Sequence, residues 1–151
     1  MRNPYTYQVQ LTWLESRKGL LQSDVLDATI EVATPPEFAK GIIGVWSPEH
    51  LFVAAVSSCV MTTFLALAEK SRLKFIHFKC NAIGIIEKKE DKLMVTKITV
   101  SPILTIANKG DFLKGIKVLE ITEKSCIISN SIKSELIFFQ QVKVEDASDN
   151  K

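Results

Sequence analysis

Residues 47–72 read SPEHLFVAAVSSCVMTTFLALAEKSR, and this stretch decides the fold. Ser47 is a good helix N-cap, Pro48 is tolerated at the first helical position, and Glu49 suits the positive end of the helix dipole. Residues 51–68 are almost all apolar or small, which predicts a helix buried on all sides. At ~1.5 Å per residue the helix would be roughly 36 Å long. One small chain cannot easily cover such a helix, so the sequence favours a dimer.

The length of this apolar run also raises a membrane alternative, because ~18 apolar residues can form a transmembrane helix. Small polar residues interrupt the run in its middle, and no second candidate span follows. They are Ser57, Ser58, Cys59, Thr62 and Thr63. We therefore favour a buried core helix and expect no membrane partner.

The composition is that of a globular protein. The chain has 151 residues, which predicts one domain over residues 1–151, with residues 145–151 as a frayed polar tail. Hydrophobic residues make up 46% and charged residues 24%, a balance that excludes a disordered chain. A net charge of +2 is too small to indicate a nucleic-acid partner. Alternating residues rather than an apolar signal core follow Met1, so we expect a cytoplasmic protein.

Hydrophobic periodicity predicts the remaining elements. A period of two indicates strands over residues 7–13, 76–86 and 93–106. Further strands are predicted over residues 19–22, 28–33 and 135–144. A second helix is predicted from Asp111 to about Cys126. Pro102 predicts a bulge or an edge position within its strand. This order of elements predicts an α+β domain with an antiparallel sheet.

The three cysteines are the candidates for chemistry, because a cytoplasmic protein keeps thiols reduced unless they react. They are too few for a disulfide scaffold, and their spacing fits no zinc motif, so we expect no metal. Cys80 lies between Phe78 and Ala82 on the apolar face of a predicted strand. We expect it to be a core residue, since free cysteine usually behaves as a small hydrophobe.

Cys59 and Cys126 each leave two interpretations open. Cys59 lies in the middle of the apolar helix among small neighbours such as Ala55 and Ala66. It is either a core residue or a nucleophile, and a nucleophile would need a lowered pKa. Cys126 lies at the end of the second helix, as a capping residue or as a thiol able to approach another sulfur. A disulfide needs Cα atoms within ~7 Å, which the sequence does not reveal.

Two motifs resemble the OsmC/Ohr family of organic hydroperoxide reductases. Residues 46–59, WSPEHLFVAAVSSC, are similar to the family pattern Asn-Pro-Glu-x-Leu-x-x-Ala-x-x-x-x-Cys, with Glu49 and Cys59 in register. Residues 123–129, EKSCIIS, resemble the family's Cys-Pro-x-Ser element. The order of elements also matches, over residues 7–144.

The resemblance implies a fold and a mechanism. The family fold is an intertwined homodimer with two long central helices, and its active sites lie at the subunit interface. By resemblance, Cys59 attacks an organic hydroperoxide, Cys126 resolves the sulfenic acid to a disulfide, and a small or protein-bound dithiol reduces it. Residues 16–19, SRKG, are similar to the family's Gly-Arg-x-Gly setting. This implies that Arg17 activates the thiolate and that Glu49 orients Arg17. No metal or organic cofactor is implied.

This chain departs from the family patterns at three positions. Ser47 replaces the asparagine, Ser16 replaces the first glycine, and Ile127 replaces the proline after the second cysteine. The last change bears on how the helix end is held.

Three further expectations concern function. Apolar residues such as Phe38, Trp46 and Phe52 favour an alkyl or fatty-acid hydroperoxide over hydrogen peroxide. The alternative is a non-catalytic OsmC-like dimer that binds a hydrophobic small molecule, with Cys59 as a packing residue. Acyl transfer by a thiol ranks last, because the sequence offers Cys59 no histidine partner.

Overall fold

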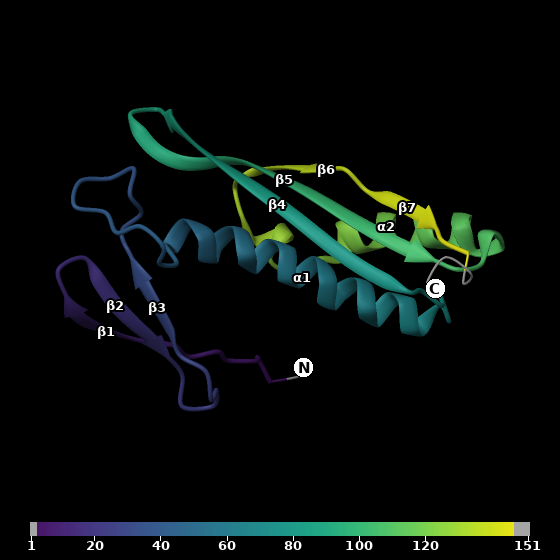
Figure 1. The fold of residues 1–151 in the computed structure, drawn as a ribbon, viewed down its shortest axis with the longest axis horizontal. Helices are drawn as coiled ribbons and strands as arrows, with labels where there is room; N and C mark the ends of the chain where they lie inside the picture. The colour runs from purple at the N-terminus through teal and green to yellow at the C-terminus, as the bar shows by residue number, and fades with distance from the viewer. Residues whose placement is uncertain (1–2, 147–151) are drawn as a thin grey trace. The chain divides into compact units, whose positions relative to one another are not determined.

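The computed structural model describes residues 3–146 (Figure 1). Contacts within the chain separate two compact units, which meet in sequence between Leu51 and Phe52, and each has its own sheet. Of the predicted tail, residues 147–151 lie outside the described residues. The assignment of residues 1–151 to one domain stays a prediction.

The first unit carries a three-stranded antiparallel sheet in the order β1–β2–β3. Its strands are β1 (Gln10–Glu15), β2 (Lys18–Gln22) and β3 (Ile30–Ala33). Ser16 and Arg17 form the turn between β1 and β2, and Ser16 has a φ of 47°, in the left-handed region that tight turns use. The indole N–H of Trp13 donates to the Ser16 carbonyl at 3.1 Å and holds this turn. All three predicted strands are present, although the first begins at Gln10.

Helix α1 (Pro48–Lys70) begins as its sequence predicts. The Ser47 hydroxyl accepts a hydrogen bond from the backbone N–H of His50 at 3.2 Å, which caps the helix. Within one chain only a single stripe of α1 is fully covered, at every fourth position: Val56, Val60, Phe64 and Ala68. By length and composition alone α1 could cross a membrane, and it is the one such helix among the described residues. Its buried stripe on a sheet is the pattern of a core helix.

The second unit is built on a long antiparallel hairpin of β4 (His77–Lys89) and β5 (Lys92–Ile106). The predicted last strand is two strands, β6 (Glu135–Phe138) and β7 (Gln141–Val144). Both pair with β5, and both run parallel to it (Figure 1). The predicted α+β class with an antiparallel sheet is confirmed, and β6 and β7 add parallel pairing along one side of β5.

Pro102 lies in the central strand, so the predicted bulge or edge position is wrong. The register between β4 and β5 runs without interruption through the pair Cys80 and Pro102. On the other side of β5, pairing with β6 ends at Val100 and pairing with β7 resumes at Ile103. Pro102 thus lies opposite the break between two strands, where its missing N–H leaves no partner unsatisfied.

Alternate residues of β5 form the apolar face of the sheet against which both helices pack. Ile98, Val100, Leu104 and Ile106 have no exposed surface. Phe64 of α1 stacks on Phe78 of β4 with ring centroids 4.4 Å apart. Helix α2 (Phe112–Ser125) approaches the sheet closely at Gly115, where a Cβ would lie 3.1 Å from the Leu104 side chain. This packing places the end of α2 beside the middle of α1.

Candidate functional site

Cys59 and Cys126 lie together in the second unit, although 67 residues separate them in sequence. Cys59 lies in the middle of α1 and is partly buried. Cys126 is the C-cap residue of α2 and has no exposed surface. The two thiols lie in one apolar cluster, which also contains Val56, Val60 and Ile128. Both are free thiols in the structure.

The surroundings of Cys59 favour its thiolate. Burial raises the pKa of Cys59, but the hydrogen bonds around the sulfur outweigh this effect and leave the pKa below its ordinary value. In order of size, the donors are the Cys126 thiol, the Ile128 N–H, the Thr63 hydroxyl and the Ile127 N–H. The Thr63 oxygen lies 3.9 Å from the sulfur, one helical turn along α1. A thiol with this property is a candidate nucleophile.

The pKa of Cys126 is shifted in the opposite direction, above its ordinary value. Burial raises its pKa, and so does its role as hydrogen-bond donor to Cys59, because a donor thiol must keep its proton. The hydroxyl and the N–H of Ser129 oppose this shift but do not overcome it. The pair therefore consists of one thiolate-prone sulfur and one protonated sulfur, as an attacking thiol and its resolving partner require.

Cys80, the third thiol, packs against the same apolar cluster. Burial raises the pKa of Cys80 to about 11, against a weaker hydrogen bond from the Ser101 N–H. Its sulfur lies 3.9 Å from the Asn81 carbonyl, an acceptor that also favours the protonated form. The predicted role of Cys80 in the core agrees with this environment.

Arg17 and Glu49 belong to the first unit, and they form no ion pair with each other. The ion pairs of the described residues are Lys18–Glu31, Lys88–Asp91 and Lys114–Asp111. Arg17 is exposed in the β1–β2 turn and lines a cavity of about 430 Å³ together with Trp13 and Pro48. The Oε2 atom of Glu49 is buried and has no hydrogen-bond partner among the described residues. A buried carboxylate oxygen without a hydrogen-bond donor costs free energy. The hydrogen bonding of the Glu49 carboxylate is therefore incomplete in this single chain. The assigned roles of these two residues stay predictions.

An apolar pocket lies in the second unit along the same helix as Cys59. Phe52, Met94, Val95, Lys133 and Ser134 line it, with a volume of about 280 Å³. Phe52 lies two helical turns before Cys59, and both Phe52 and Val95 pack against the cluster that contains the two thiols. Of the three residues predicted to favour an apolar substrate, Phe52 lines this pocket. Phe38 and Trp46 belong to the first unit.

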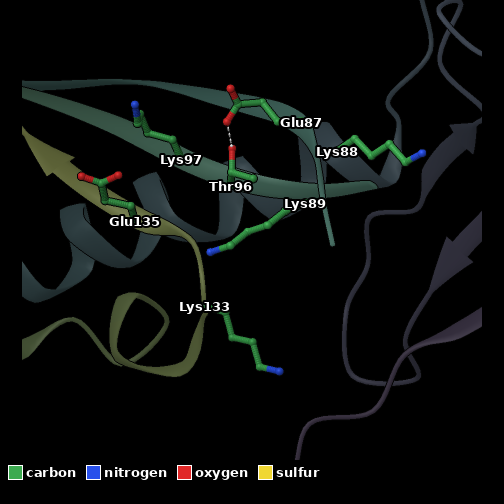
Figure 2. Close-up of a pocket in the computed structure, with 7 residues that line it drawn as sticks. All are labelled: Glu87, Lys88, Lys89, Thr96, Lys97, Lys133 and Glu135. Atoms are coloured by element: carbon green, nitrogen blue, oxygen red, sulfur yellow. Dashed lines mark hydrogen bonds between the residues drawn. The ribbon is translucent and has the colours of Figure 1, made fainter. Parts of the chain in front are cut away.

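A second pocket carries four lysines but none of the predicted site residues. It has a volume of about 410 Å³, and its lining includes Lys88, Lys89, Lys97 and Lys133. Figure 2 shows that their ammonium groups point in different directions and that the carboxylates of Glu87 and Glu135 lie among them. Lys88 is paired with Asp91 at 3.1 Å. The pocket therefore lacks the convergent donors of an anion site.

Sequence reasoning missed the donors that surround Cys59. Two of them are backbone N–H groups, at Ile127 and Ile128, and any residue except proline supplies such a group. The available signal is the replacement of the expected proline by Ile127, which restores an N–H at that position.

Comparison with known proteins agrees with this fold. The family model described as OsmC-like protein matches residues 44–138, and the chain therefore belongs to the OsmC-like family. No curated protein sequence matches the chain.

Solved structures share the fold over nearly the whole chain. An OsmC-like protein of unknown function from Vibrio cholerae is 25% identical, with a TM-score of 0.80, and the match covers 91% of this chain and 99% of that one. An organic hydroperoxide resistance protein OsmC from Legionella pneumophila is 17% identical, with a TM-score of 0.70, over 93% and 100% of the two chains. An organic hydroperoxide resistance protein from Elizabethkingia anophelis is 19% identical, with a TM-score of 0.69, over 93% and 99%.

Proposed function

We propose that this protein is a thiol-dependent peroxidase that reduces organic hydroperoxides. The observation that carries the proposal is that Cys59 and Cys126, far apart in sequence, lie in one apolar cluster. The lowered pKa of Cys59 and the raised pKa of Cys126 agree with an attacking and a resolving thiol. Family membership supports it, because some structural relatives are named organic hydroperoxide resistance proteins.

The reaction proceeds in three balanced steps. The Cys59 thiolate attacks the terminal oxygen of ROOH, the O–O bond breaks, and the products are a Cys59 sulfenic acid and ROH after protonation. The Cys126 sulfur then attacks the sulfenic sulfur, an S–S bond forms, and the hydroxyl leaves as water with the Cys126 proton. A dithiol reduces the Cys59–Cys126 disulfide by exchange and is itself oxidised to a disulfide.

The apolar pocket beside Phe52 supports an organic substituent on the peroxide. A hydrocarbon group that enters this pocket leaves water, and each buried CH₂ contributes about 0.8 kcal/mol. Hydrogen peroxide has no such group and gains nothing there. We therefore assign organic hydroperoxides as the substrate class and a small or protein-bound dithiol as the reductant.

The proposal includes a homodimer in the cytoplasm. Met61 and Leu65 on α1 are 41% and 42% exposed in the single chain, within a stretch of the helix that has no charged residue. A second copy packed on this face would remove them from water. Arg17 and Glu49 are proposed to complete the site in that assembly, with the Arg17 guanidinium supplying the donor that the Glu49 carboxylate lacks.

Steady-state turnover of cumene hydroperoxide with a dithiol tests the proposal. Wild-type protein should consume peroxide continuously, and Cys59→Ser should not consume it at all. Cys126→Ser should complete one oxidation and then stall or over-oxidise, because no resolving thiol protects the sulfenic acid.

The matched control is Cys80→Ser, which should keep wild-type turnover. If Cys59→Ser retained wild-type turnover, the mechanism would be wrong. If the wild-type protein showed no turnover, a non-catalytic dimer that binds a hydrophobic molecule would replace the peroxidase.

A further inference from the structure

The apolar pocket that Phe52 lines has one charged side chain in its described lining. Phe52, Met94 and Val95 supply the apolar surface of the pocket, and Lys133 and Ser134 complete it. The Ser134 hydroxyl donates its proton to the Val95 carbonyl at 2.6 Å, so it has no further proton to donate to a ligand. The Lys133 ammonium is therefore the side-chain donor that a polar group in this pocket meets.

The charge of Lys133 is not neutralised within the described part of the chain, because Lys133 takes part in none of its ion pairs. Lys133 also borders the pocket with four lysines, but Figure 2 shows its ammonium pointing away from the carboxylates of Glu87 and Glu135. Those carboxylates have other neighbours. Glu87 accepts a hydrogen bond from the Thr96 hydroxyl, and Glu135 lies opposite Lys97 in the strand register. The Lys133 ammonium is thus available to an anionic ligand.

Lys133 belongs to a segment that packs beside the reacting sulfur. It directly follows Ile132, which packs against the apolar cluster that contains Cys59. Phe52 lies two helical turns before Cys59 on α1, roughly 10 Å along the helix axis. A hydroperoxide whose peroxide group reaches Cys59 can therefore lay its hydrocarbon in the pocket, with its far end at Lys133. The apolar wall strengthens the attraction of Lys133 for an anion, because it lowers the local dielectric.

We propose that Lys133 is a specificity-determining residue, which selects organic hydroperoxides that carry an anionic group at the end of the hydrocarbon opposite the peroxide. The inference rests on the proposed function, in which Cys59 attacks the peroxide, and it narrows the substrate class of that site. Lys133 touches the far end of the substrate and not the reacting atoms, so the chemistry at Cys59 does not require it. A neutral hydroperoxide enters the same pocket without this ion pair.

A hydroperoxy fatty acid and its methyl ester isolate the charge, because they share one hydrocarbon. For the wild-type protein, kcat/KM should be about fivefold higher for linoleic acid hydroperoxide than for methyl linoleate hydroperoxide, which is the scale of an exposed ion pair. Lys133→Gln should lower the value for the acid by about fivefold and leave the value for the ester within about twofold. Salt at about 1 M should remove the preference of the wild-type protein, because it screens exposed charges.

Lys89→Gln is the matched control. Lys89 lines the pocket with four lysines but not the apolar pocket, and its substitution changes the net charge by the same amount. This variant should keep the wild-type ratio of acid to ester. An unchanged ratio in Lys133→Gln would overturn the inference, and so would an equal fall in Lys89→Gln, which would assign the preference to net charge.

The binding of dodecanoate and of dodecanol, which contain no peroxide, separates this inference from the proposed function. Calorimetry on the reduced wild-type protein should give a Kd about fivefold lower for dodecanoate than for dodecanol, and Lys133→Gln should remove the difference. A Kd for dodecanoate that does not respond to this substitution would overturn the inference even if the protein turns over peroxides. A response of the Kd without any turnover would keep the selection of anions by Lys133 and reject only the peroxidase.

Discussion

Oxidation should stabilise the folded protein, because a Cys59–Cys126 disulfide would close a large loop. The two thiols already lie in the same apolar cluster of the folded chain. A cross-link between residues that are 67 positions apart removes enough entropy from the unfolded chain to stabilise the native state by about 4 kcal/mol. For a chain of this size, that corresponds to a rise in Tm of roughly 8 to 16 °C.

The assay is thermal unfolding of the same preparation before and after one equivalent of cumene hydroperoxide. The oxidised wild-type protein should melt at the higher temperature, and a dithiol should restore the lower one. Cys126→Ser treated in the same way should show no rise, since it cannot close the loop. An unchanged or lower Tm on oxidation would refute the reasoning, and a product of doubled mass on non-reducing gels would place the disulfide between chains.

Three further predictions follow from the packing and the site. Phe64→Ala should lower the free energy of unfolding by about 3–5 kcal/mol in urea titrations, because Phe64 is fully buried and stacked; Phe139→Ala, at a site 62% exposed, should cost far less. Cys80 should resist alkylation in the folded protein at about pH 8, because burial raises its pKa to about 11, and rapid labelling there would contradict its placement. Arg17→Lys should slow peroxide turnover by about tenfold or more, because lysine lacks the planar fork of donors, and an unchanged rate would remove Arg17 from the site.

Much of the fold could be predicted because its longest elements have strong periodicity. Helix α1 and the β4–β5 hairpin extend over many turns or residue pairs, and both lie where the sequence predicts them. The break between β6 and β7 was not predicted, since residues 135–144, ELIFFQQVKV, contain no glycine or proline to mark it. Alternation also carries no information on direction, so the parallel pairing with β5 could not be deduced.

The candidate site was predictable only in part, because it depends on tertiary packing and on main-chain groups. Sequence indicated that Cys59 and Cys126 were candidates, but their contact depends on how α1 and α2 pack on β5. The donors at Ile127 and Ile128 belong to the main chain, which has nearly the same composition at every position. The predicted partnership of Arg17 with Glu49 rests on resemblance, and the single chain does not make that ion pair.

The account depends most on a two-cysteine cycle, and intact mass with thiol alkylation tests it most directly. After one equivalent of cumene hydroperoxide, the protein should lose the mass of two hydrogen atoms. Peptide mapping should assign the loss to a Cys59–Cys126 linkage, with Cys80 still free and alkylated after unfolding. Free, unreacted thiols at Cys59 and Cys126 under the same conditions would contradict the peroxidase and favour a dimer that binds a hydrophobic ligand.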